Sequence, residues 1–195
     1  TAYAIADALE AATGRRPHIV VLNLHRDKVE VNVRPTSEPT GGQPEAIAAY
    51  DRFHSLVEAA SRAAKAQYGS AFLIDVHGLS SSYSEIQWGY LLPGTEFTMD
   101  DTRLDHPAYA LSSSLRAVAE ANPGEYAALT RGSHSMGGLL AARGYAGVPS
   151  PQFPFPTDSE GDPYNYNNGG YIVSTHTSVA GGTVSGLQME PPLRP

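Results

Sequence analysis

A histidine and a carboxylate stand together where one apolar run of the sequence ends. His77 follows the run 71–76, with Asp75 two positions before it and Gly78 directly after it. Residues two apart on a strand point to the same side, so the Asp75 carboxylate could orient the His77 imidazole toward a metal ion. A hydrogen-bonded histidine at a strand end would give the same pattern, and this motif alone leaves both interpretations open.

A second carboxylate, Glu190, follows the predicted strand 184–189 and precedes two prolines. A strand end followed by proline is stiff and would hold the carboxylate in place, as a general base requires. Zinc and a glutamate together activate water for amide hydrolysis, because the metal lowers the pKa of water to about 7. Isolated glutamates are also common on protein surfaces, which is the alternative interpretation.

Polar side chains of both charge signs follow a further apolar run, residues 18–23. The polar segment 25–34 includes Arg26, Asn32 and Arg34. An arginine can bind a carboxylate through two parallel hydrogen bonds, and an asparagine adds another donor. The segment therefore indicates either a binding site for a substrate carboxylate or a solvated loop with surface ion pairs.

A glycine pair and two further side chains lie late in the chain. Gly169 and Gly170 precede Tyr171, and His176 follows five residues later. A backbone-permissive turn with an aromatic ring and an imidazole could cap a substrate pocket, although turns and sheet edges use the same residues. We expect Tyr171 and His176 to contact substrate if the first interpretation holds.

These residues need strands and helices to position them. The sequence predicts helices over residues 2–13, 44–68, 107–121 and 134–143, strands over residues 18–23, 71–76, 86–92, 170–175 and 184–189, and a long loop over residues 149–170. Strands that alternate with helices, followed by late strands, predict an α/β fold with a mixed sheet between helices.

The composition sets limits on the class of protein. With 195 residues, of which 41% are hydrophobic and 17% charged, the chain is expected to form a single domain over residues 1–195. The net charge of -7 and the scattered basic residues give no support to nucleic-acid binding. Since the chain has no cysteine, a metal ion would depend on histidine and carboxylates. No apolar stretch reaches the roughly 18 to 20 residues that span a bilayer, and the compartment stays open.

Taken in order, these segments resemble the N-formylglutamate amidohydrolase family, whose fold is similar to that of zinc carboxypeptidases and aspartoacylase-like deacylases. Residues 24–32 (Leu-His-Arg-Asp-Lys-Val-Glu-Val-Asn) look like the family's His-Arg…Asp-x-Asn-Arg segment, and residues 73–78 look like its Asp-x-His-[Ser/Gly] metal motif. Residues 169–172 and 186–190 look like its late Gly-Gly-Tyr and Gln-x-Glu segments. The ordered set spans most of the chain and is more specific than any single motif.

The resemblance implies a three-layer α/β/α sandwich and a zinc-dependent amidohydrolase or deacylase. The substrate would be a small N-acylated amino acid or a peptide end. By this resemblance His77 is a zinc ligand, Glu190 is the catalytic base, and Asn32 with Arg26 or Arg34 receives the substrate carboxylate.

The chain departs from the family pattern in two places. No Pro-His-[Ser/Gly]-Gly segment, which carries the other metal-binding positions of the family, precedes the helical pattern at Thr1. Such a segment was either removed by trimming or processing, or never present. Val33 stands where the family has arginine, and on a strand-like backbone Arg34 would point to the opposite face. A non-catalytic binding or self-assembling module is therefore the alternative function, with self-association through strand edges that a missing strand would expose.

Overall fold

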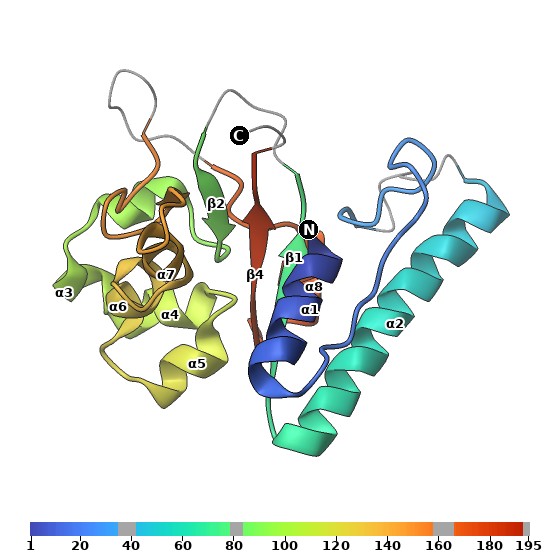
Figure 1. Ribbon diagram of the computed structural model, residues 1–195, viewed down its shortest axis with the longest axis horizontal. Coiled ribbons are helices and arrows are strands. Elements are labelled where there is room, and N and C mark those ends of the chain that lie inside the picture. Colours follow the sequence, from blue (N-terminus) through green and yellow to red (C-terminus); the bar gives the residue numbers. More distant parts are fainter. Residues whose placement is uncertain (35–41, 79–83, 158–165, 193–195) are drawn as a thin grey trace. The chain divides into compact units, whose positions relative to one another are not determined.

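The computed structural model describes residues 1–34, 42–78, 84–157 and 166–192, and the chain divides into two compact units, Thr1–Gly69 and Ser70–Pro195. In the described ranges the elements are α1 (Ala2–Thr13), α2 (Pro44–Tyr68), β1 (Ala71–Val76), β2 (Ile86–Gly89), the 3-10 helix η1 (Gly94–Thr98), α3 (Asp101–Leu104), α4 (Pro107–Ser112), α5 (Arg116–Ala121), α6 (Tyr126–Arg131), α7 (Met136–Ala141), β3 (Gly147–Val148), α8 (Tyr171–His176) and β4 (Val184–Glu190) (Figure 1).

The first unit contains the two predicted helices α1 and α2. Pro44 begins α2 at a position where its missing N–H is not needed, and Glu45 in the first turn complements the positive end of the helix dipole. The helix ends at Gly69, whose left-handed φ of 79° lets its N–H donate to the Lys65 carbonyl. Both helix predictions are confirmed.

The predicted strand over residues 18–23 is wrong. The segment lies in the first unit and forms no helix or strand, and none of the four strands among the described residues pairs with it. A β-branched run fits a pleated surface, but a strand also needs a hydrogen-bonded neighbour. Propensity alone therefore did not decide the structure of this segment.

The second unit is built on a four-stranded sheet in the order β1-β4-β2-β3. β1 and β4 are parallel, β4 and β2 are antiparallel, and β2 and β3 are parallel. The sheet is therefore mixed and the unit is an α/β structure, as the sequence predicts. All seven residues of β4 are buried, which agrees with its position between β1 and β2.

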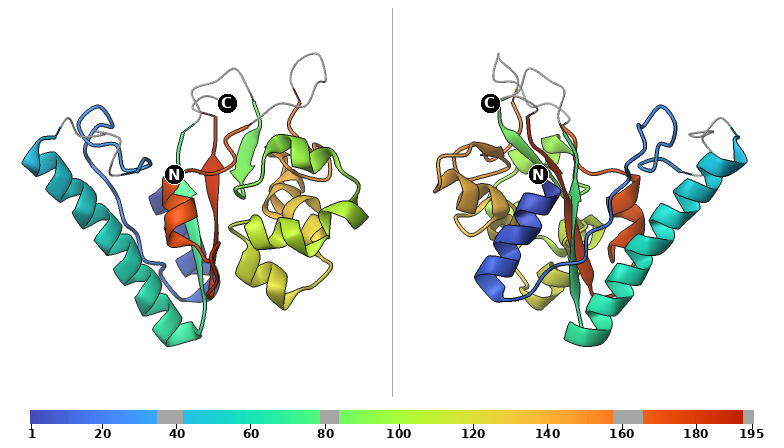
Figure 2. Two further views of the ribbon diagram at one scale, coloured as in Figure 1. Left: turned by 180° about the vertical axis from the view of Figure 1, so that it is seen from behind. Right: turned by 45° about the vertical axis from the view of Figure 1, so that its right-hand side comes forward.

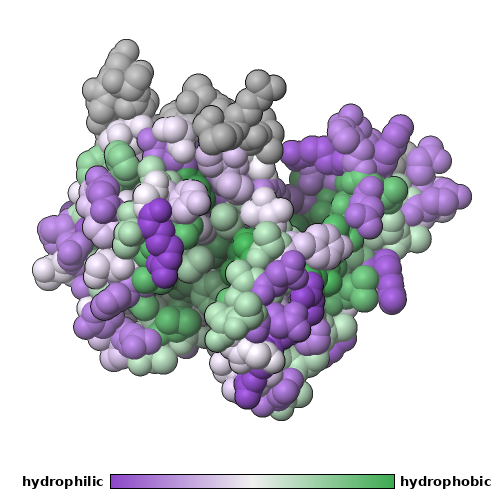
Figure 3. Space-filling view, viewed as in Figure 1, coloured by the Kyte–Doolittle hydropathy of each residue, from purple (hydrophilic) through white to green (hydrophobic). Residues whose placement is uncertain are grey.

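Helices surround this sheet within the second unit. Figures 1 and 2 show α3 to α7 gathered beside β2, and α8 contacts both β1 and β4. On the visible face of the molecule, apolar and hydrophilic side chains are interspersed (Figure 3).

Burial of Tyr90 and Tyr126 raises the pKa of both phenols far above the ordinary value, so both side chains stay neutral inside the core. No helix in the described ranges is long and apolar enough to cross a membrane.

The helix predicted over residues 107–121 is interrupted in the structure. Ser113 and Ser114 are fully buried between α4 and α5. The Ser113 hydroxyl accepts a hydrogen bond from the Leu115 N–H, which offers the backbone an alternative to helical pairing. The Ser114 N–H donates to the Tyr90 carbonyl, and the Ser114 carbonyl accepts from the Gly186 N–H, so the interruption joins this region to the sheet.

The strand predicted over residues 170–175 is a helix, α8. Its β-branched residues favour a strand, but Ile172, Val173 and His176 are buried at the i, i+1, i+4 spacing of one helix face. The strand predicted over residues 86–92 stops at Gly89, because Leu91 adopts a left-handed φ of 69° that cannot continue a ladder. The predicted helix over residues 134–143 is shorter, at Met136–Ala141.

Candidate metal centre

The candidate centre lies at the carboxyl ends of two parallel strands. β1 and β4 pair with Asp75 opposite Gln188 and with Val76 opposite Met189. The His77 N–H continues the ladder by donating to the Met189 carbonyl at 2.9 Å. Since parallel strands end at the same edge of a sheet, this register brings His77 next to Glu190, the last residue of β4.

The two ring nitrogens of His77 face two different carboxylates. Nε2 lies 2.9 Å from Oδ2 of Asp75, and Nδ1 lies 3.8 Å from Oε1 of Glu190. An ionised carboxylate only accepts hydrogen bonds, so Nε2 carries the proton toward Asp75. In the neutral ring, Nδ1 is then the nitrogen with the lone pair, and it is the nitrogen turned toward Glu190.

A glutamine that the sequence analysis did not select completes this arrangement. Gln188 Nε2 donates to Glu190 Oε1 at 2.7 Å, and the two residues are only 4% and 6% exposed. They lie two positions apart on β4, so their side chains share one face of the sheet. The spacing Gln-x-Glu was visible in the sequence and could have identified Gln188 as the residue that positions the Glu190 carboxylate.

The neighbouring strand also contributes to this face. Gln87 of β2 is paired with Glu190, and its Oε1 accepts from both the backbone N–H and the side-chain Nδ2 of Asn167, at 3.0 and 3.1 Å. These bonds anchor the segment before Gly169 to the sheet. The Gly-Gly-Tyr segment is therefore attached to β2, which is the neighbour of the strand that carries Glu190.

The donor chemistry of this centre fits part of a zinc site. The 3.8 Å between His77 Nδ1 and Glu190 Oε1 exceeds a hydrogen bond. Glu190 thus faces the ring nitrogen that would bind zinc without bonding to it, which suits a general base beside the metal. Within residues 1–34, 42–78, 84–157 and 166–192, no group of three or more histidine or acidic side chains is placed to hold a metal ion. The described residues thus offer one of the ligands that zinc needs, His77, with Glu190 beside it as the candidate base.

Tyr171 and His176 are the first and last residues of α8. Five residues around a helix correspond to about 140°, so these two side chains point in different directions. Beyond His176, the Ser178 N–H donates to the Val184 carbonyl at the beginning of β4, and Glu190 lies six residues, about 20 Å, farther along that strand. His176 is therefore at a helix end near the start of β4, and not at a strand end as the sequence suggested.

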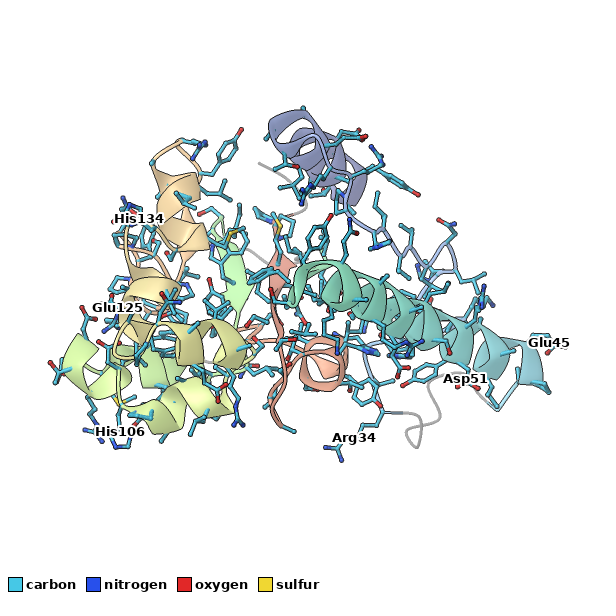
Figure 4. All side chains as sticks on the ribbon, turned by 90° about the horizontal axis from the view of Figure 1, so that it is seen from below. Arg34, Glu45, Asp51, His106, Glu125 and His134 are labelled. Carbon is cyan, nitrogen blue, oxygen red and sulfur yellow. The ribbon has the colours of Figure 1, made fainter. Side chains whose placement is uncertain are left out.

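The polar segment 25–34 belongs to the first unit. Arg26 forms an ion pair with Glu30, whose Oε1 also accepts from the Asn32 N–H at 2.9 Å. Asn32 and Val33 lie in bends, so the strand-like backbone assumed for this stretch is not present. Arg34 is the last described residue before residue 42, and its side chain points away from the ribbon (Figure 4).

Two side chains of α2 hold this segment in place. The Tyr50 hydroxyl donates to the Val33 carbonyl at 2.8 Å, and His54 Nε2 lies 3.1 Å from the Val31 carbonyl. The two rings also lie against each other, with centroids 4.3 Å apart. Burial lowers the pKa of His54 below its ordinary value of 6.5, and the hydrogen bond to Val31 and the charge of Asp51 offset part of that effect.

The lowered pKa of His54 makes the first unit sensitive to acid. Because the unfolded chain takes up the proton near pH 6.5 and the folded chain only at lower pH, stability is expected to fall as the pH drops below 6.5. After correction for the intrinsic exchange rates, the rate of amide exchange along α2 should therefore rise as the pH falls from 7 to 5. His54→Gln, which keeps a donor but does not titrate, should lose most of this pH dependence. Equal pH dependence in both proteins would contradict the assignment.

Comparisons with known protein families, with curated proteins and with solved structures found no match. The resemblance to the N-formylglutamate amidohydrolases therefore rests on the motifs themselves.

Proposed function

We propose that this protein is a zinc-dependent amidohydrolase or deacylase of the N-formylglutamate amidohydrolase type, acting on an N-acylated amino acid or a peptide end. The observation that carries the proposal is the position of His77 between Asp75 and Glu190, with Nε2 directed to one carboxylate and Nδ1 to the other. The mixed sheet with helices agrees with the α/β/α sandwich of zinc carboxypeptidases, which we include in the proposal.

In this proposal each side chain of the centre has one task. His77 would ligate zinc through Nδ1, with Asp75 holding the ring by its bond to Nε2. When bound, zinc supplies Lewis-acid polarisation of the acyl carbonyl and of water. Glu190 takes a proton from the attacking water as the C–O bond forms, and passes it to the amide nitrogen as the C–N bond breaks. The products are a carboxylic acid and a free amine.

The substrate-binding roles complete the proposal. Within the first unit, we propose that Asn32 with Arg26 or Arg34 binds a carboxylate, and that Arg26 exchanges its present partner, Glu30, for that group. Tyr171 is retained as a proposed contact with substrate, whereas His176, near the start of β4, lies too far from Glu190 for that role. Single alanine substitutions at the retained positions should raise KM more than they lower kcat if they bind substrate in its ground state.

Asp75→Asn is expected to weaken zinc binding about 10- to 100-fold, because the amide can still accept from His77 Nε2 but no longer supports the ring with negative charge. A competition titration with a chelating dye would measure the zinc affinity. Asp51→Asn, at an exposed carboxylate on α2, is the matched control and should leave the affinity unchanged. Equal zinc affinities of Asp75→Asn and wild type would show that Asp75 does not support zinc binding by His77.

The proposed function is tested with the zinc-supplemented protein and a panel of N-formyl, N-acetyl and longer N-acyl amino acids. Release of amine should be observed for at least one class, zinc should appear by elemental analysis, and both should be lost in His77→Ala. The proposal fails if the folded wild type binds no zinc and hydrolyses no member of the panel. Circular dichroism of both proteins would show that each remains folded.

A second candidate, a non-catalytic self-assembling module, is supported by a different observation. Among the described residues β1 pairs with β4 alone, and Phe72 on β1 is 48% exposed. A strand that pairs on one edge can add another strand. Light scattering would detect assembly, and Phe72→Lys should reduce it. A monomer at all concentrations would exclude this candidate.

A further inference from the structure

A separate hollow in the second unit has the size of a small-molecule site. Its volume is about 640 Å³, and all of its lining residues lie within residues 91–112. Small-molecule sites typically occupy about 300 to 1,000 Å³. Asp75, His77 and Glu190 do not line this hollow, so it is not part of the candidate metal centre.

Three side chains with hydrogen-bond donors line the hollow. Arg103, His106 and Tyr109 are spaced three residues apart, and the N–H of each later residue donates to the carbonyl of the one before it, both at 3.1 Å. These bonds form the turns at the end of α3 and the start of α4, on either side of the extended backbone of His106. His106 Nδ1 accepts from the Ala108 N–H, so the neutral ring carries its proton on Nε2. Figure 4 shows His106 at the outer border of this helical region.

Part of the lining is apolar, and one of its residues has an unusual backbone conformation. Leu91 and Leu92 line it, and Leu91 is the one residue other than glycine with a positive φ among the described residues. The Leu91 N–H donates to the Asn168 carbonyl, and a Cβ at Gly169 would lie 2.7 Å from Leu91 Cδ2. Non-glycine residues keep such a conformation only where their surroundings enforce it, which is common at ligand sites. The contacts with Asn168 and Gly169 thus hold Leu91 in place where it lines the hollow.

Two opposite charges line the hollow without neutralising each other. Neither the Glu96 carboxylate nor the Arg103 guanidinium forms an ion pair or side-chain hydrogen bond with any residue in the described parts of the chain. A ligand with one negative and one positive group could therefore meet both. A phosphate or a dicarboxylate would leave Glu96 opposed to a second negative charge.

We propose that this hollow binds a zwitterionic α-amino acid with an apolar side chain. The ligand carboxylate accepts hydrogen bonds from Arg103 and His106, its ammonium group pairs with Glu96, and its side chain packs on Leu91 and Leu92. Because this site shares no residue with the metal centre, it stands or falls independently of the proposed hydrolase activity.

The test is a titration of the whole ¹⁵N-labelled protein with L-phenylalanine, followed by NMR. Saturable shifts are expected for amides within residues 91–112, and Arg103→Gln and Glu96→Gln should each weaken binding about tenfold. The control is Arg143→Gln, since Arg143 is exposed and bonded to the Leu139 carbonyl outside the hollow. It should bind as the wild type does.

Two analogues separate the contributions of the charged groups. Phenylacetate lacks the ammonium group and phenethylamine lacks the carboxylate, so each should bind about tenfold more weakly than phenylalanine. The absence of saturable shifts at millimolar phenylalanine would overturn the proposal. Equal binding of phenylacetate and phenylalanine would also overturn it, because Glu96 would then have no role in recognition.

Discussion

Glu190→Gln is expected to lower kcat for amide hydrolysis about 10²- to 10⁴-fold, because an amide cannot take the proton that a general base must accept. The substitution keeps the shape of the side chain, and Gln188 Nε2 can still donate to the oxygen that remains. Zinc content and folding should therefore change little. Steady-state kinetics on the best substrate of the acyl amino acid panel would measure the loss.

Glu125→Gln is the matched control for this experiment. Glu125 is an exposed carboxylate at the start of α6 whose side chain makes no capping hydrogen bond, and it should be replaceable without loss of activity. If Glu190→Gln retained the wild-type kcat, Glu190 would be a structural partner of Gln188 and not the base. A loss of stability in Glu190→Gln would point to the same conclusion.

Gly89→Ala is expected to reduce the free energy of unfolding by about 3 kcal/mol or more, since it forces backbone against backbone. A Cβ on Gly89 would lie 2.4 Å from Gly169 N, 2.5 Å from the Asn168 carbonyl carbon and 2.7 Å from the Asn167 oxygen. None of these atoms can rotate away as a flexible side chain could. Urea denaturation followed by circular dichroism would measure the change.

Gly144→Ala provides the control for Gly89→Ala. Gly144 has a φ of 85°, but no atom lies within 4 Å of the position that an added methyl group would take, so alanine there should cost only the conformational strain, about 1 kcal/mol. Similar losses at both positions would mean that the segment 167–169 moves freely away from β2. A much larger loss at Gly89 would confirm that this segment is packed against the strand.

The elements that carry the candidate centre could be predicted because their signals were local. The predicted strands 71–76 and 184–189 were bounded by polar residues, and both form strands that place His77 and Glu190 at one sheet edge. The long helix α2 was marked by Pro44 at its start and Gly69 at its end. Each of these features depends on the residues of a single segment.

The features that the sequence did not reveal depend on contacts between distant segments. α8 is helical despite its β-branched residues, because its buried positions pack on β1 and β4. The segment 18–23 has the composition of a strand but no strand pairs with it in the described part of the chain. The close approach of Gly89 to Gly169 is a relation between residues 80 positions apart, which no local pattern reports.

The central claim is that His77 presents Nδ1 toward Glu190, where zinc would bind. Long-range ¹H–¹⁵N NMR of the imidazole rings, recorded during a zinc titration, tests it most directly, because it reports which ring nitrogen carries the proton. We expect the proton on Nε2, directed to Asp75, and a selective change of Nδ1 as zinc is added. A proton on Nδ1, or a His77 ring that zinc leaves unchanged, would contradict the account.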